Sequence, residues 1–404
     1  MSIATKTVSI AAAILLPVSL SFAQAPQPGD QFMFGGPAFD IATTPSGSIL
    51  IVDFDTVREI RTNDVRELIS LPVVFDEGGF GEIQPTFING LAPIGNGRFF
   101  AARSALDLSV GAALFDVRPG SAKTSRACIL LGMLGGTCPA EETLLAADIE
   151  AFTLGNWPVN VPGQQPGWKD FNCEPPGGFS AGPQTNPYHI AAISPTDVLV
   201  ADAAGNSLLH ARTDGSTELV ATFDPATDPE TGDRLILFPL DEDTDCYVEP
   251  VPTSIAIGAD GDYYVGELIG SAPENFGGQP TPAGLASVWR IDPDARNARC
   301  PSEQCTKVVT GLDSVIDMEF GPDGKLYVVE FERNGFLATV APDLEIPMAG
   351  GTVKRCDVAD NSCEIIEGED GTLFLPGAIT FDNSDNLWLL DNVFAPTVRR
   401  IDWQ

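Results

Sequence analysis

The chain has 404 residues, of which 56 are Asp or Glu and 22 are Lys or Arg, so its formal net charge is −34. A charge of this sign and size repels the phosphates of nucleic acids and of anionic membranes, and it excludes nucleic acid as a partner. It is compatible with cations, with cationic partners, or with a solvated acidic surface that has no special function.

Residues 1–23 have the pattern of a secretory signal peptide. Lys6 precedes an apolar stretch from Val8 to Leu20, and small residues follow up to an expected cleavage after Ala23. The stretch is too short for a membrane-spanning helix, and no other segment is a better candidate. We therefore expect an exported protein, periplasmic or extracellular, that does not insert into a membrane.

A hairpin pattern recurs six times along the rest of the chain. Each copy is an apolar strand, a tight turn often containing Gly, and a second strand that usually ends in a carboxylate. The copies are Ile41–Asp53, Leu91–Arg103, Ile190–Asp202, Ile255–Glu267, Met318–Glu330 and Ile379–Asp391. Their spacing is the same throughout, so they are structural repeats.

A second strand pair follows most copies, so each repeat predicts a four-stranded antiparallel sheet. Six such sheets predict an all-β protein, a six-bladed β-propeller that occupies residues 30–404 as one domain. After the last copy, residues 397–404 supply only one more strand. Gln31–Gly35 is the unassigned candidate for the missing strand, so we expect the N-terminal strand to close the ring. Only residues 139–152 have a helical composition.

Two long segments, 132–186 and 224–251, lie between blades as insertions. Strand order places both at the end where the innermost strands begin, which we call the top face. Long ordered loops in a compact fold usually carry function. We therefore expect a small molecule or a protein to bind at the top face of a monomer.

The eight cysteines fit an oxidising compartment. Spacing favours one bridge between Cys356 and Cys363 and another between Cys300 and Cys305, each flanking a hairpin turn. Cys128 and Cys138 are near neighbours, which leaves Cys173 with Cys246. A zinc site is the alternative, although no CxxC pair is present.

Polar residues gather just before the first strands of the repeats, at the predicted channel mouth. Oxygen ligands suit a hard cation such as Ca²⁺, and Asp40, Asn89 and Asp317 are the candidates. The alternative is that these groups bind only water or backbone. The whole candidate ligand site is Asp40, Asn89, Tyr188, His189, Ser254 and Asp317.

Other motifs assign no catalytic residue. The sequence lacks a Gly-x-Ser-x-Gly motif and a phosphate-binding loop. The carboxylates that end the repeats, such as Asp202, are expected to accept backbone N–H groups from the turn that follows, which is a structural role.

The stretch VADAAGNSLLHA (Val200–Ala211) resembles NHL-repeat propellers. GLDSVIDMEFGPDGKLYVVEF (Gly311–Phe331) and LFLPGAITFDNSDNLWLLDN (Leu373–Asn392), with GGTVKRC between them, resemble the ScyD/ScyE family. Members of that family are exported six-bladed proteins named from scytonemin biosynthesis clusters, without a settled activity. The resemblance implies the fold and export rather than a reaction.

The wider superfamily includes hydrolases similar to gluconolactonase and regucalcin, which hold a divalent metal at the channel mouth. Asn89–Leu91 matches their Asn motif in place and frame. Ile316-Asp317-Met318 approximates their Asp-Gly-Met motif one position out, and Asp40 is the carboxylate nearest to their Glu. Streptogramin-lyase-like propellers use a His near the channel, and His189 is similarly placed. The sequence thus favours a ligand- or partner-binding protein, with a metal-dependent hydrolase, lactonase or lyase at the channel mouth as the alternative.

Overall fold

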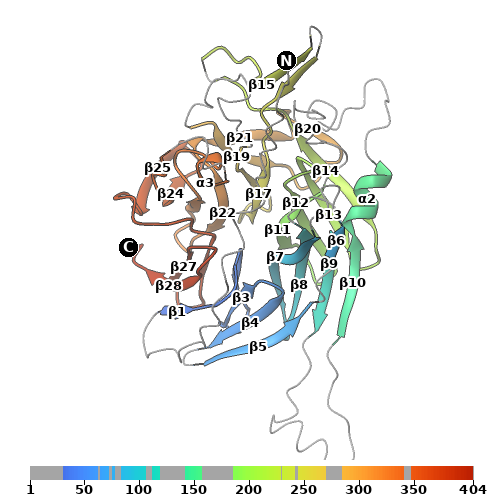
Figure 1. Cartoon of the computed structure of the whole chain (residues 1–404), viewed down its shortest axis with the longest axis vertical. Coiled ribbons are helices and arrows are strands. Elements are labelled where there is room, and N and C mark those ends of the chain that lie inside the picture. Colours follow the sequence, from blue (N-terminus) through green and yellow to red (C-terminus); the bar gives the residue numbers. More distant parts are fainter. Residues whose placement is uncertain are drawn as a thin grey trace, which may run out of the picture.

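The computed structural model shows an almost all-β protein, a six-bladed propeller whose sheets follow one another around the ring in chain order (Figure 1). It describes residues 31–61, 64–71, 75–77, 83–105, 112–118, 142–156, 185–228, 230–241, 244–269, 284–340 and 347–403. The expected signal peptide lies outside these residues. Within them, no helix is long and apolar enough to cross a bilayer.

Each blade begins with its innermost strand. The first blade contains β2 (Ile41–Thr43), β3 (Ile49–Asp53), β4 (Thr56–Arg61) and β5 (Asp64–Ser70), and the second contains β7 (Ile83–Gly95), β8 (Arg98–Ala105), β9 (Ala113–Arg118) and β10 (Glu142–Asp148). The third contains β11 (Pro187–Ala192), β12 (Asp197–Asp202), β13 (Ser207–Arg212) and β14 (Thr217–Phe223).

The fourth blade contains β17 (Pro252–Ile257), β18 (Tyr263–Glu267), β19 (Ala286–Ile291) and β21 (Cys305–Leu312). The fifth contains β22 (Val315–Phe320), β23 (Leu326–Glu330), β24 (Thr352–Asp357) and β25 (Ser362–Glu367), and the sixth contains β26 (Ala378–Phe381), β27 (Leu387–Asp391) and β28 (Thr397–Ile401). The predicted fold class is confirmed, because neighbouring strands within these blades pair antiparallel.

The sixth blade takes its outermost strand from the other end of the chain. Strand β1 (Gln31–Met33) pairs antiparallel with β28, with Gln31 opposite Arg399 and Met33 opposite Thr397. Blue β1 lies beside red β28 in Figure 1. This is the position that the sequence assigned to the N-terminal strand.

Additional elements surround the blades. Strand β6 (Phe75–Glu77) extends the second sheet, and β20 (Ala298–Cys300) adds to the third in parallel. A hairpin of β15 (Ile236–Asp241) and β16 (Thr244–Tyr247) lies in the 224–251 insertion. The helices described are α2 (Ile149–Asn156) and α3 (Leu337–Val340).

The expectation of a helical segment within a long insertion was wrong for part of its length. Residues Glu142–Asp148 form β10, which pairs with β9 as the fourth strand of the second blade, and the helix begins only at Ile149. Ala, Leu and Glu favour a helix intrinsically, but pairing with an open sheet edge outweighs so weak a preference. The insertion is therefore shorter than predicted.

Among the described residues the apolar core is divided into six clusters, each mainly between two neighbouring blades. Leu199 and Val220 of the third blade meet Val265 and Trp289 of the fourth, for example, and the first and last blades share a cluster of their own that contains Ile51 and Leu390. Each sheet thus buries both of its faces, which a single sheet cannot do alone. The ring is therefore one cooperative unit.

The repeated tight turns hold backbone conformations that favour Gly. Gly324 has φ of 76° and Gly261 has φ of 88°. The sixth repeat has Asp385 at the equivalent position with φ of 60°, a conformation that Asp tolerates better than most residues.

Two of the four expected disulfides are confirmed. Cys300 is bonded to Cys305, and Cys356 is bonded to Cys363, which lies directly opposite it on β25. Cys128, Cys138 and Cys173 lie outside the described residues. The side chain of Cys246 does as well, so the other two expected bridges stay predictions.

Candidate ligand site in the central channel

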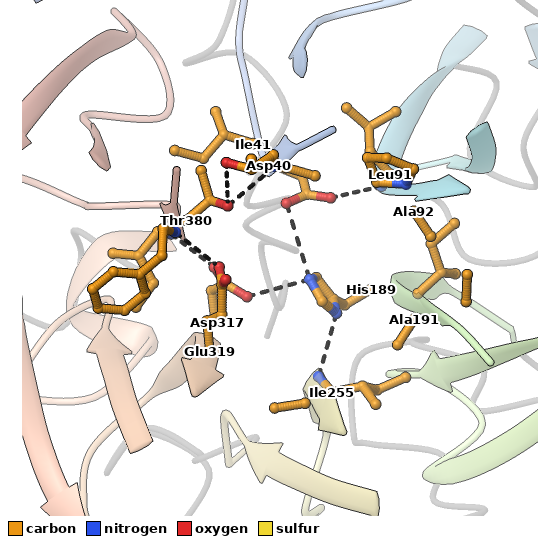
Figure 2. Close-up of a pocket in the computed structure, with 18 of the residues that line it drawn as sticks. Asp40, Ile41, Leu91, Ala92, His189, Ala191, Ile255, Asp317, Glu319 and Thr380 are labelled. Carbon is orange, nitrogen blue, oxygen red and sulfur yellow. Dashed lines mark hydrogen bonds and ion pairs between the residues drawn. The ribbon is translucent and has the colours of Figure 1, made fainter. Parts of the chain in front are cut away.

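Three side chains from alternate blades converge inside the ring. Asp40 directly precedes β2, His189 lies in β11 and Asp317 lies in β22, and the three point toward one another (Figure 2). One ligand atom from each lies within 4.8 Å of the others. His189 Nε2 is 3.2 Å from Asp317 Oδ1 and 3.9 Å from Asp40 Oδ1. We call Asp40, His189 and Asp317 the channel triad.

A β-bulge at the start of the innermost strand positions two members of the triad. The pairing of β11 with β12 skips Tyr188, and the pairing of β22 with β23 skips Ile316. The same shift occurs in β7 and β17. A bulge adds one residue to a strand and changes the direction of the side chains beside it. His189 and Asp317 are thereby the first regularly paired residues after the bulge in their strands.

We call the first residue of each of the six repeats, from Ile41 to Ile379, its anchor, and the residue just before the anchor alternates in character around the ring. Blades one, three and five carry Asp40, His189 and Asp317, whereas blades two, four and six carry Gly90, Ser254 and Ala378. At Gly90 a side chain would meet the backbone of Tyr188 and His189 at about 3.1–3.3 Å. Small residues in the even blades therefore leave room for the triad.

Each triad residue also accepts a hydrogen bond from the next blade. The backbone N–H groups of Leu91, Ile255 and Ile379 donate to Asp40 Oδ2 at 2.6 Å, His189 Nδ1 at 3.3 Å and Asp317 Oδ2 at 2.8 Å, respectively. These donors are the anchors of the even blades. The triad therefore links the blades in pairs.

Large apolar residues lie one position nearer the top face in the same odd blades. Phe39 stacks on Phe87 with ring centroids 5.0 Å apart. Phe39 and Tyr188 both pack against the apolar cluster that contains Ile316. This packing helps to bury the triad, since Asp40 is only 1% exposed and Asp317 3%.

A cavity of about 500 Å³ begins at the triad and follows the innermost strands. Its wall contains one Ala from each of four blades, Ala42, Ala92, Ala191 and Ala256. It extends to the exposed residues Pro45 and Asn383, which lie in the turns at the opposite end of these strands. The cavity thus connects the triad with the short-turn face, whereas the sequence led us to expect a site at the top face.

Glu319 is a cavity-lining acid that the sequence analysis did not select. It lies two residues after Asp317 on β22, on the same side of the strand, and its Oε2 accepts a 3.3 Å bond from the N–H of Phe381. The signal was available, because the equivalent position carries Ala in four repeats and Thr380 in the sixth.

Burial and mutual repulsion shift the protonation of the site. Burial, and then the charge of Asp317, raise the pKa of Asp40 well above its usual value. Burial likewise raises the pKa of Asp317, and it raises that of Glu319 to about 8. Burial lowers the pKa of His189, although Asp317 opposes this shift. Burial and the two aspartates also raise the pKa of Tyr188. The imidazole is therefore neutral at pH 7, and the carboxyl groups retain protons more readily than in water.

The remaining predicted residues do not line this cavity. Asn89 donates through Nδ2 to Ser104 Oγ at 2.5 Å and to Asn186 Oδ1 at 3.0 Å. Ser254 is fully buried beside Gly266 and Val315. Asn89 Oδ1 and Ser254 Oγ have no hydrogen-bond partner in the described part of the chain. Tyr188 belongs to the apolar packing above the triad. Asp40, His189 and Asp317 are the predicted residues that the structure brings together.

The structural role expected for Asp202 is confirmed. Its Oδ1 accepts bonds from the N–H groups of Gly205 at 3.0 Å and Asn186 at 2.6 Å, and its Oδ2 accepts one from the hydroxyl of Thr185 at 2.7 Å. The carboxylate thus organises the turn that follows it.

The triad fits a divalent metal only in part. Asp40 Oδ1 is buried without a hydrogen-bond partner among the described residues, as a metal ligand would be. His189 does not fit, because a backbone N–H can only donate, so Nδ1 accepts and the neutral ring carries its proton on Nε2. Metal-binding histidines normally donate from their second nitrogen to an acceptor. Two carboxylates alone fall short of the six to eight oxygens that Ca²⁺ takes.

Comparisons with known proteins find similarity in fold. No protein-family model matches the chain, and no curated protein matches its sequence. Among solved structures it resembles a PQQ-bound aldose sugar dehydrogenase from Streptomyces coelicolor (TM-score 0.48, 11% identity, 93% of this chain and 96% of that one). It also resembles a gluconolactonase from Xanthomonas campestris (0.46, 12%, 93% and 92%) and a streptogramin B lyase (0.38, 10%, 92% and 97%). Identities this low concern the fold alone.

Proposed function

We propose that this propeller binds a small molecule in its central channel, with the channel triad at the polar end of the site. One observation carries the proposal. Asp40 Oδ1 is a buried carboxylate oxygen without a hydrogen-bond partner in the described residues, and Asp40 lines a cavity of about 500 Å³. A buried acceptor left unsatisfied costs about 1–3 kcal/mol, which a ligand donor would recover. The cavity has the volume of a typical small-molecule site.

The finer sequence predictions belong to this proposal. The two disulfides suit an oxidising compartment, which supports export to the periplasm or the medium. The motifs quoted above support a protein similar to the ScyD/ScyE family. Two further proposals come from the sequence. One is a calcium ion held by Asp40, Asn89 and Asp317, which the calcium titration below tests, and the other is a partner at the top face of a monomer.

An enzyme acting at the same site is the second candidate. His189 Nε2 lies between the carboxyl groups of Asp40 and Asp317, and burial raises the pKa of both. An imidazole and two carboxyl groups that can exchange protons therefore lie together at the end of the cavity. Such pairs are typical of general acid–base catalysis. A hydrolase, lactonase or lyase is the corresponding class of reaction.

The proposal is tested by obstructing the channel. Ligand-observed NMR would screen the full-length protein with butylamine hydrochloride, butan-1-ol, sodium butyrate and δ-valerolactone. Ala191→Leu fills part of the cavity, and Ala359→Leu makes the same change on an exposed turn. We expect at least one probe to bind the wild type and Ala359→Leu but not Ala191→Leu. The proposal fails if no probe binds, or if Ala191→Leu binds like the wild type.

The enzyme candidate is tested by turnover. Hydrolysis of δ-valerolactone would be followed by acid release in wild type and in His189→Gln. Turnover that falls at least tenfold in this variant supports a hydrolase, whereas binding without turnover supports a binding protein.

A further inference from the structure

Most of the ionisable side chains among the described residues that line the cavity are acidic. They include three carboxyl groups, those of Asp40, Asp317 and Glu319, and one imidazole, that of His189, but neither Lys nor Arg. An anionic ligand would meet no positively charged side chain there, and its repulsion by buried carboxylates is screened less than repulsion by exposed ones. The lining therefore favours a cationic ligand.

The hydrogen bonds of the three carboxyl groups show which oxygen lacks a donor. Asp317 Oδ2 accepts from Ile379, its Oδ1 lies 3.2 Å from His189, and Glu319 Oε2 accepts from Phe381. Asp40 Oδ2 accepts from Leu91, but Oδ1 has no hydrogen-bond partner among the described residues and lies 3.9 Å from His189. A ligand that binds here would therefore place a hydrogen-bond donor beside Asp40 Oδ1.

The size and wall of the cavity distinguish an organic cation from a metal ion. A bare ion would fill a small fraction of about 500 Å³ and would leave the alanine wall without contacts. Ala42, Ala92, Ala191 and Ala256 present methyl groups that suit the methylenes of a short chain. A primary ammonium group has three donors and no acceptor, which matches a set of carboxylate acceptors.

We propose that the channel binds a small primary organic ammonium ion, whose head donates to Asp40 Oδ1 and whose apolar body lies along the alanine wall toward the short-turn face. This inference rests on the proposed function, because it names the ligand class of the same cavity. Burial raises the pKa of the Asp40, Asp317 and Glu319 carboxyl groups, and a positive head beside them would favour their ionised forms. The body displaces water from an apolar surface.

The test is calorimetric titration of the full-length protein at pH 8.5, where butylamine is protonated and Glu319 is mostly ionised. The probes are butylamine hydrochloride, the isosteric neutral butan-1-ol, sodium butyrate and calcium chloride. Asp40→Asn keeps the shape of the side chain and the acceptor for Leu91 but removes the charge. Asp385→Asn removes one charge from an exposed turn of the sixth blade and serves as the matched control. Glu319→Gln is a second channel variant in case Asp40→Asn does not fold.

We expect butylammonium to bind the wild type and Asp385→Asn equally, and Asp40→Asn or Glu319→Gln at least about tenfold more weakly. The inference is overturned if butan-1-ol binds as tightly as butylammonium, if neither channel variant weakens binding, or if only Ca²⁺ binds. Binding of δ-valerolactone or butan-1-ol that Ala191→Leu abolishes, without ammonium binding, would leave the proposed function standing. If Ala191→Leu changes the binding of none of the probes, both proposals fail.

Discussion

The backbone N–H of Leu91 in the second blade donates a 2.6 Å hydrogen bond to Oδ2 of Asp40 in the first blade. The same relationship joins Ile255 to His189 and Ile379 to Asp317, so each odd blade is bound to the even blade that follows. Oδ1 of the same Asp40 carboxylate has no such partner among the described residues. One side chain thus links two blades and leaves an acceptor for a ligand.

Asp40→Ala should destabilise the protein because it leaves the Leu91 N–H buried without its acceptor. The expected loss in free energy of unfolding is about 1–3 kcal/mol. Asp40→Asn keeps an acceptor oxygen and removes a buried charge, so its loss should be less than half as large. Urea unfolding at pH 7 measures both, with exposed Asp294→Ala as the control. Equal losses in the two Asp40 variants would show that this hydrogen bond does not stabilise the ring.

The sequence was sufficient to predict the ring because the fold repeats its local signals. Six anchors, each at the same position in its repeat, define the innermost strands. The tight turn of each repeat predicts a Gly with positive φ, and Gly324 has this conformation. The short final repeat implied a strand from elsewhere, and β1 is paired at that place. These features depend on periodicity and turn chemistry, which a single sequence displays.

The site was only partly predictable because it depends on relationships between blades. The sequence placed Asp40, His189 and Asp317 before their anchors, but the bulges that direct two of these side chains have no residue signature of their own. Asn89 occupies the equivalent region yet binds Ser104 and Asn186. The direction of the cavity depends on how Phe39 and Tyr188 pack, which strand spacing does not specify.

His189 should be neutral at pH 7 with its proton on Nε2. The N–H of Ile255 faces Nδ1, which must accept, and burial lowers the pKa of the ring below its usual 6.5. Nitrogen-15 NMR would distinguish the tautomers, and His210→Gln would assign the signals, since the chain has two histidines. A proton found on Nδ1 would contradict the Ile255 hydrogen bond and would make Nε2 available as a metal ligand.

Glu319 should make stability depend on pH. Burial, and then the charge of Asp317, raise its pKa from 4.5 to about 8, so the folded state binds the proton more tightly than the unfolded state. The stabilising contribution is complete below pH 4.5 and is lost as the pH rises to about 8. Relative to Glu319→Gln, the wild type should therefore lose about 1–3 kcal/mol over this interval, since solvent in the channel reduces the full effect.

Urea unfolding of the wild type and of Glu319→Gln at pH 5, 6.5 and 8 measures this difference. Exposed Glu303→Gln is the matched control, and its stability should follow that of the wild type at every pH. A constant difference between wild type and Glu319→Gln would mean that Glu319 titrates alike in the folded and unfolded states.

Strand β1 should stabilise the ring through one side chain. Phe32 is buried in the cluster shared by the first and sixth blades, and its ring centroid is 6.2 Å from that of Trp388. Its neighbour Met33 is 74% exposed. Successive side chains of a strand point to opposite faces, so Phe32 is buried and Met33 is not. Phe32→Ala should lower the free energy of unfolding by about 3 kcal/mol, at the lower end for a Phe in a core. Met33→Ala should stay within about 0.5 kcal/mol of the wild type.

Removing residues 31–33 altogether should have a larger consequence than either substitution. It would expose the edge of β28, whose backbone groups pair with β1 in the folded ring, and an open edge promotes pairing with other chains. We expect the truncated protein to unfold at a lower temperature and to aggregate, as measured by light scattering during thermal unfolding. If the truncated protein stays soluble with an unchanged melting temperature, and Phe32→Ala is as stable as Met33→Ala, then β1 lies against β28 without stabilising the sixth blade.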